Sequence, residues 1–150
     1  MSELPLGNIT SANASLVLTV LNLFPAGIRL EMFSVDGGIS MEELQLADTR
    51  MSLDGHMLAG YIPTPKTVQI GLEPASPSYE ALCQLFRATE RRRGFYECNL
   101  ALTLPDLNAG KIYTWTQGVL VSGTILPPVR QLLDPTSWTF RFEKFYTVGA

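Results

Sequence analysis

The stretch KTVQIGLEPASPSYEALCQLF, residues 66–86, changes its periodicity halfway along. Its first half alternates apolar and polar residues, which is typical of a strand with one buried face. The apolar positions of this strand are Val68, Ile70 and Leu72. The other positions, which would face away from the core, are Thr67, Gln69, Gly71 and Glu73. The alternation specifies the orientation of the strand, because a slip of one residue would turn the apolar set outward.

The second half of the stretch predicts a helix. Ser76 suits the N-cap and Pro77 suits the first helical position. The apolar residues that follow recur at helical spacing and form one stripe: Tyr79, Leu82, Cys83 and Phe86. An arginine run, residues 91–93, occupies the last turn, where positive charge suits the helix dipole. We expect Gly94 to end the helix.

The period of two dominates the rest of the chain. Strand-like segments are expected at residues 15–24, 28–35, 39–46, 97–104, 111–123 and 137–145. Turn signals separate them, among them Asp54-Gly55 and Pro127-Pro128. We therefore predict a single domain over residues 1–150 that is mainly β, a β-sandwich or barrel of about seven or eight strands with one packed α-helix.

The sequence offers little for chemistry. Acidic residues outnumber basic ones by 14 to 11, a mild balance that argues against a dedicated nucleic-acid binder. His56 is the only histidine, and it lies in a Gly-punctuated turn without the context of a catalytic serine. Cys83 and Cys98, which we expect to be buried apolar groups, leave too few ligands for zinc. We expect no catalytic residue, metal or cofactor, and so no enzyme.

A long segment between strands, residues 36–63, is rich in apolar side chains. They are Met41, Leu44, Leu46, Met51, Met57, Leu58 and Tyr61. Either these residues fold back onto the core of their own subunit, or they contact neighbouring subunits. We favour an inter-subunit contact loop, because long loops are usually functional. The arginine run is likewise either a solvated helix end or a contact with another protein.

The order of these elements resembles that of the tail tube proteins of contractile-tailed bacteriophages, whose fold is shared with the tube protein of the type VI secretion system. In that family a strand like TVQIGL leads through a serine-containing turn into a short helix like SPSYEALCQLF, residues 76–86. The segment ISMEELQLADTRMSLDGHM, residues 39–57, resembles the acidic β-hairpin that precedes this strand, and WTFRFEKF, residues 138–145, is the closing aromatic strand. The resemblance is one of elements and spacings, and it extends over most of the chain.

The resemblance implies a structural role in a virion. Tail tube proteins form stacked hexameric rings around a channel through which DNA passes, inside a contracting sheath. The implied partners are other copies of the chain and the sheath, baseplate and tail-terminator proteins, with neither sequence-specific DNA binding nor a membrane anchor. The implied location is the tail of the virion, and the host cytoplasm during assembly.

The resemblance also suggests roles for particular residues. An acidic or neutral channel lining keeps DNA from binding, and the candidates for it are Thr67, Gln69, Gly71, Glu73, Glu31 and Glu97. The run Arg91, Arg92 and Arg93 is not part of the family pattern; because the net charge argues against DNA, we assign it to a contact with the sheath or the next ring. Two alternatives stay open: a tube initiator or baseplate protein of the same fold, and a monomeric β-barrel that binds an apolar ligand.

Overall fold

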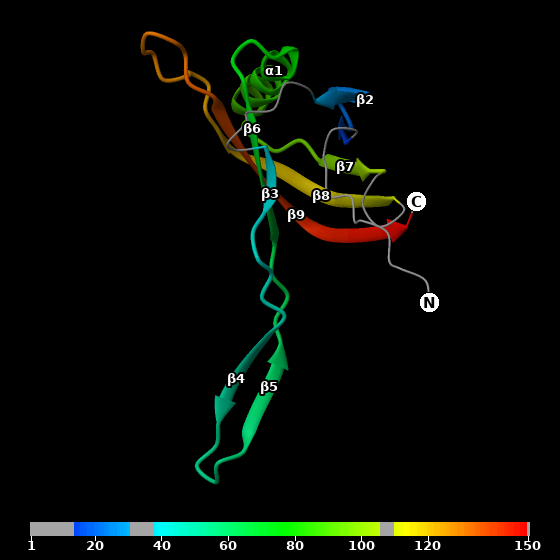
Figure 1. The fold of residues 1–150 in the computed structure, drawn as a ribbon, viewed down its shortest axis with the longest axis vertical. Helices are drawn as coiled ribbons and strands as arrows, with labels where there is room; N and C mark the ends of the chain where they lie inside the picture. The colour runs from blue at the N-terminus through cyan, green and yellow to red at the C-terminus, as the bar shows by residue number, and fades with distance from the viewer. Residues whose placement is uncertain (1–13, 31–37, 106–109, 150) are drawn as a thin grey trace, which may run out of the picture.

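A computed structural model describes residues 14–30, 38–105 and 110–149, which form nine strands and one helix (Figure 1). In chain order the elements are β1 (Ser15–Val20), β2 (Phe24–Leu30), β3 (Ile39–Met41), β4 (Ala47–Met51), β5 (Met57–Tyr61), β6 (Lys66–Leu72), α1 (Pro77–Arg92), β7 (Cys98–Leu104), β8 (Lys111–Gly123) and β9 (Thr136–Gly149). The predicted mainly β fold with one packed helix is confirmed. Within the described ranges, no helix has the length and apolar character needed to span a membrane.

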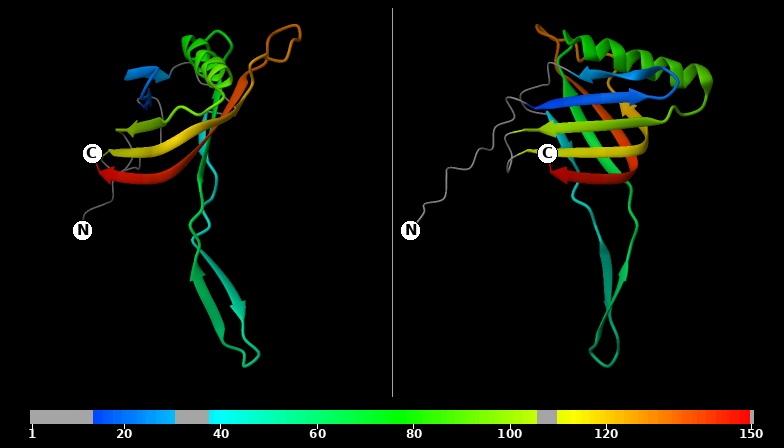
Figure 2. Two further views of the ribbon diagram at one scale, coloured as in Figure 1. Left: turned by 180° about the vertical axis from the view of Figure 1, so that it is seen from behind. Right: turned by 90° about the vertical axis from the view of Figure 1, so that its right-hand side faces the viewer.

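Seven strands form one antiparallel sheet in the order β2-β1-β7-β8-β9-β6-β3. β8 and β9 are long and pair with each other along most of their length. On its other side β8 pairs with β7 through residues 111–118, whereas β9 pairs with β6 through residues 136–142. The sheet therefore folds over along β8 and β9, and Figure 2 shows the β1–β7 side facing β6 across the interior. The result is a sandwich whose two layers share these long strands.

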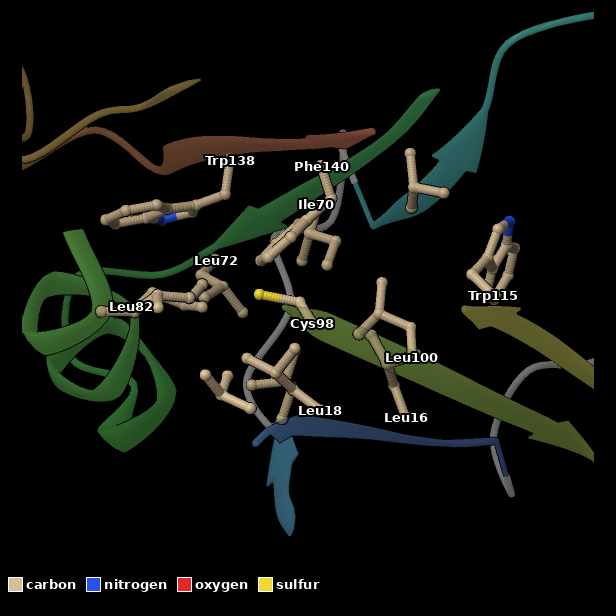
Figure 3. Packing of buried hydrophobic residues seen from close by; sticks show 14 of the residues in the cluster. Leu16, Leu18, Ile70, Leu72, Leu82, Cys98, Leu100, Trp115, Trp138 and Phe140 are labelled. Carbon is tan, nitrogen blue, oxygen red and sulfur yellow. The ribbon is translucent and has the colours of Figure 1, made fainter. Parts of the chain in front are cut away.

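The core between the layers is built from the apolar faces that the alternation predicts. The β6 and β9 contributions are Val68, Ile70, Leu72, Trp138, Phe140 and Phe142. The opposite layer contributes Leu16, Leu18, Val20, Cys98 and Leu100 (Figure 3). All of these side chains are almost completely buried. Because residues far apart in the sequence share this core, its burial stabilises the whole sandwich as one unit.

Helix α1 closes one end of the sandwich (Figure 1). Ser76 is the N-cap, and its side chain accepts a hydrogen bond from the Ser78 N–H at 3.1 Å. Leu82, Cys83 and Leu85 are buried in the core, so the stripe predicted from the sequence also includes Leu85. The Tyr79 ring packs edge-on against Trp138, with ring centroids 6.2 Å apart.

The helix ends differently from the expectation. Arg93, not Gly94, takes the left-handed conformation, with φ 54°. The Arg93 N–H donates hydrogen bonds to the carbonyls of Thr89 and Glu90. The left-handed region is unfavourable for a residue with a Cβ. A contact across this turn offsets part of that cost, because the Arg92 guanidinium lies 4.8 Å from the centre of the Tyr96 ring.

The count of strands exceeds the prediction because residues 36–63 contain a hairpin. β4 and β5 pair only with each other, and they project from the sandwich as a separate two-stranded arm (Figures 1 and 2). The expected strand at residues 39–46 is shorter than predicted, since β3 ends at Met41. The expected strand at residues 28–35 begins earlier, at Phe24, and its last part lies outside the described residues.

Candidate functional site

The side chains best suited to catalysis or metal binding, the histidine and the two cysteines, do not lie close together in the fold. His56 is exposed on the turn of the β4–β5 arm, whereas both cysteines are free thiols buried in the core. Burial raises the pKa of Cys98 to about 12, so its thiol stays protonated at neutral pH. No cluster of three or more histidine, cysteine or acidic side chains that could hold a metal occurs in the part of the chain that the structure describes.

The predicted polar side of β6 is only partly exposed in the subunit. Gln69 is exposed, but Thr67 is 7% exposed and Gly71 is buried. Gln69 pairs with Ser40 of β3 and Thr139 of β9, which places these three on one side of the sheet. The surface that we call the β6–β9 polar face consists of Ser40, Gln69, Ser137, Thr139 and Arg141.

The glutamates proposed for the same surface do not join it as a group. Glu73 follows β6 and is half-buried in the turn before α1, where its carbonyl accepts a hydrogen bond from the Ser76 N–H at 3.0 Å. Glu97 directly precedes β7, which lies in the other layer of the sandwich. Glu31 lies outside the described residues. A channel lined by the β6–β9 polar face would therefore not include Glu97.

The β4–β5 arm has two different faces. Its register pairs Ala47 with Tyr61, Thr49 with Ala59 and Met51 with Met57, and these pairs share one apolar face. The other face carries Asp48 and Arg50, opposite Gly60 and Leu58. Every residue of both strands is exposed, and Tyr61 exposes 75% of its surface. The arm thus presents an apolar strip, the arm apolar face, that no part of its own subunit covers among the described residues.

The base of the arm belongs partly to the subunit itself. Met41 packs against the core, and the Trp115 indole N–H points at its sulfur with an Nε1–Sδ distance of 3.2 Å. Leu44 is half-buried, whereas Leu46, Met51, Met57 and Leu58 are exposed. The first interpretation therefore holds for the start of this segment, which contacts the core. The hairpin does not fold back onto its own subunit, and its contact with neighbouring subunits stays a prediction.

A second exposed apolar surface was not predicted from the sequence. The loop between β8 and β9, residues 124–135, projects beside α1 at the opposite end of the molecule from the arm (Figure 1). Its exposed apolar side chains are Leu126, Val129, Leu132 and Leu133. Two interactions hold the loop. Arg130 forms an ion pair with Asp134 at 3.3 Å, and the Tyr79 hydroxyl donates a hydrogen bond to the Ile125 carbonyl. The sequence does contain an indication of this surface, since several apolar residues flank Pro127-Pro128. We had interpreted the proline pair only as a turn.

The predicted arginine contact lies at the far end of α1. Arg91, Arg92 and Arg93 are all exposed, and Arg92 is the one that stacks on Tyr96. Arg87 is a further exposed cation on this helix. The structure therefore presents a basic helix end on the outside of the sandwich, remote from the arm (Figure 1).

Comparison with solved structures identifies the fold. The chain resembles a chain in the baseplate of the anti-feeding prophage, with 16% identity, a TM-score of 0.56, and 99% and 98% of the two chains covered. It resembles a chain of the sheath-tube complex of an extracellular contractile injection system, with 10% identity, a TM-score of 0.54, and 90% and 88% covered. It also resembles a chain of the sheath/tube terminator of such a system, with 10% identity, a TM-score of 0.57, and 99% and 100% covered. These similarities confirm the expected tail tube-like fold.

Comparison with curated protein sequences gives no match. Comparison with protein families gives a match to one family model, and this match spans nearly the whole sandwich and the arm. The family is described as "Tail fiber protein gp32", and its sequence model matches residues 7–146. The chain therefore belongs to the family described as tail fiber protein gp32, and it has the tail tube-like fold found in tube, terminator and baseplate chains of contractile injection systems.

Proposed function

We propose that this protein is a structural, non-catalytic subunit that assembles into stacked rings and forms the inner tube of a contractile tail. The observation that carries this proposal is the arm apolar face. A two-stranded hairpin is marginally stable by itself in water, and this one exposes Met51, Met57 and Tyr61 on one side. Contiguous exposed apolar surface marks a site of protein contact.

Other copies of the chain are the proposed partners of the arm. The solved chains of the same fold come from tube, terminator and baseplate assemblies. The baseplate assembly is described as 6-fold symmetrised, which supports rings of six subunits here. β2 and β3 are the edges of the sheet, and closing a ring would cover edges that otherwise invite uncontrolled pairing. Sheath, baseplate and terminator proteins are the further partners.

The proposed channel lining is the β6–β9 polar face. Serine, threonine and glutamine side chains dominate it, and Arg141 is its one cation. A mostly neutral wall makes few of the Lys and Arg contacts that hold phosphates, so DNA could pass without binding. The protein would then be located in the virion tail after assembly from the host cytoplasm.

A second candidate is an initiating ring within the baseplate. The baseplate chain of the anti-feeding prophage has the same fold and 16% identity, and it is covered almost completely. The two roles differ in the length of the assembly. A tube protein polymerises without limit, whereas an initiator by itself stops at a ring.

Sedimentation velocity tests the proposal on the wild-type chain and two variants. The double variant Met51→Ser/Met57→Ser removes a cross-strand pair from the arm apolar face. Arg50→Ser, on the opposite face of the same hairpin, is the matched control. We expect rings and longer polymers for the wild type and the control, and a loss of polymers for the double variant.

The outcomes separate the candidates. Single rings that never extend would favour the initiator. A wild-type chain that stays monomeric at high concentration would contradict both and favour the monomeric ligand-binding barrel. Equal polymerisation of all three proteins would show that the arm apolar face is not the contact.

A further inference from the structure

A pocket of about 400 Å³ lies where the arm joins the sandwich. Its apolar lining includes Pro63 and Pro65, from the segment between β5 and β6, together with Val119 of β8 and Phe142 of β9. The pocket is open to solvent and mostly apolar. Such a pocket fits an apolar side chain presented by another molecule.

The rim of this pocket is predominantly basic. Lys66 and Arg141 line it together with one acidic residue, Glu143. The Lys66 ammonium donates a hydrogen bond to the Glu143 main-chain carbonyl at 3.1 Å, which holds the lysine beside the pocket. The rim therefore favours a ligand that carries a carboxylate next to its apolar group.

The tip of the arm has this chemistry. Leu53 is fully exposed there, and Asp54 follows it. The turn is held by hydrogen bonds from the Ser52 N–H to the His56 carbonyl at 2.8 Å and from the Gly55 N–H to the Ser52 carbonyl at 3.0 Å. Gly55 has φ 83°, which a glycine adopts without strain. The tip is therefore preorganised to present a leucine and a carboxylate together.

We propose that the arm tip of one copy, Leu53 and Asp54, inserts into the arm-base pocket of a second copy. Leu53 fills the apolar pocket, and Asp54 meets Lys66 and Arg141 on its rim. This inference rests on the proposed function and names the contact that joins successive rings. Each copy carries both a tip and a pocket, so the contact is heterologous and repeats along an open stack.

The length of the arm then limits the repeat of the stack. Leu53 is ten residues from Pro63 and thirteen from Lys66 along the chain. At about 3.3 Å per residue in a strand, the tip lies about 33–43 Å from the base. The axial repeat of the assembly should not exceed this distance.

Disulfide cross-linking tests the contact in the assembled protein. The double variant Leu53→Cys/Val119→Cys places one thiol at the tip and one in the pocket. The two positions lie an arm length apart within one chain, whereas a disulfide needs Cβ atoms about 4 Å apart, so a bond must join two copies. The native Cys83 and Cys98 are buried. We expect a ladder of multimers on a non-reducing gel after mild oxidation.

The matched control is Leu53→Cys/Gln84→Cys, because Gln84 is exposed on α1, away from the pocket. It should form no ladder. Asp54→Arg in the wild-type background should reduce polymer formation, and adding Arg141→Asp should restore it. Polymers without a ladder, or a ladder in both cysteine pairs, would overturn this inference and leave the proposed function intact. A wild-type chain that stays monomeric would overturn the proposed function, and this contact with it.

Discussion

Gly118 and Gly123 lie where β8 passes directly beneath aromatic rings of β9. A Cβ at Gly118 would lie 2.1 Å from Cδ1 of Phe142, and a Cβ at Gly123 would lie 2.1 Å from Cε3 of Trp138. No real Cβ approaches a ring carbon so closely, so these two rings occupy the space that side chains on β8 would need. At the scale of single residues, the fold therefore depends on two absent side chains as well as on the large ones present.

Gly118→Ala tests this close approach. The new methyl group would displace the Phe142 ring from the core, and we expect the free energy of unfolding to fall by about 1–3 kcal/mol. Gly60→Ala, on the exposed arm, is the control, because its Cβ would meet nothing within 4 Å. Chemical denaturation should show a change within about 0.5 kcal/mol for the control. Equal effects of the two substitutions would contradict this packing.

The buried Cys98 thiol makes stability depend on alkaline pH. Its pKa rises from 9.0 to about 12 on folding, because burial disfavours the thiolate. Above about pH 9 the unfolded thiol ionises while the folded one stays protonated, so the unfolded state is favoured. The free energy of unfolding should fall by about 1.4 kcal/mol per pH unit from this group up to about pH 12. Denaturation of Cys98→Ala should give a shallower pH dependence, and identical slopes would contradict the assignment.

The elements of the sandwich were largely predictable from the sequence, because each one buries a face against its own subunit. β6, β7 and β8 coincide closely with the alternating segments, and α1 with the helical stripe. β9 continues to Gly149, past the predicted end at residue 145. The residue pattern predicted the arm only as a contact loop, whereas the family resemblance implied a β-hairpin at residues 39–57; the observed hairpin lies further along the chain, at residues 47–61. Burial produces the alternation that identifies a strand, and neither face of the arm is buried. The β8–β9 loop was missed for the same reason, since its apolar residues have no period.

The candidate site was less predictable than the fold. Alternation assigned Thr67 and Gln69 to one face of β6, but it could not show that Gln69 is exposed and Thr67 is buried in the folded subunit. The pocket at Lys66 and Arg141 joins residues that are more than seventy positions apart. Such a site depends on strand pairing, which no local pattern specifies.

At the scale of the element, hydrogen exchange should distinguish the arm from the sandwich. The amides of β4 and β5 should exchange rapidly in isolated subunits, because the hairpin has no third strand and no covered face. In assembled tubes they should be strongly protected. The amides of β8, the middle strand of the sheet, should be protected in both states and serve as the internal reference. Equal protection of the arm in both states would contradict a role for it in assembly.

The whole molecule has two dissimilar ends. The arm projects from one end, whereas α1 and the β8–β9 loop form the other (Figure 1). Exposed apolar side chains occur at both, in the arm at Met51 and Met57 and in the loop at Leu126 and Leu132. A subunit with different contact surfaces at its ends assembles head to tail, and such contacts give rings or open stacks. Two dissimilar ends with exposed apolar side chains therefore support the proposed head-to-tail assembly.

Electron cryomicroscopy of the concentrated wild-type chain tests the central claim most directly. We expect stacked rings with an open channel, the β6–β9 polar face lining that channel, and each arm in contact with a subunit of the adjacent ring. Monomers at every concentration, or rings whose arms project into solvent without touching another copy, would contradict it.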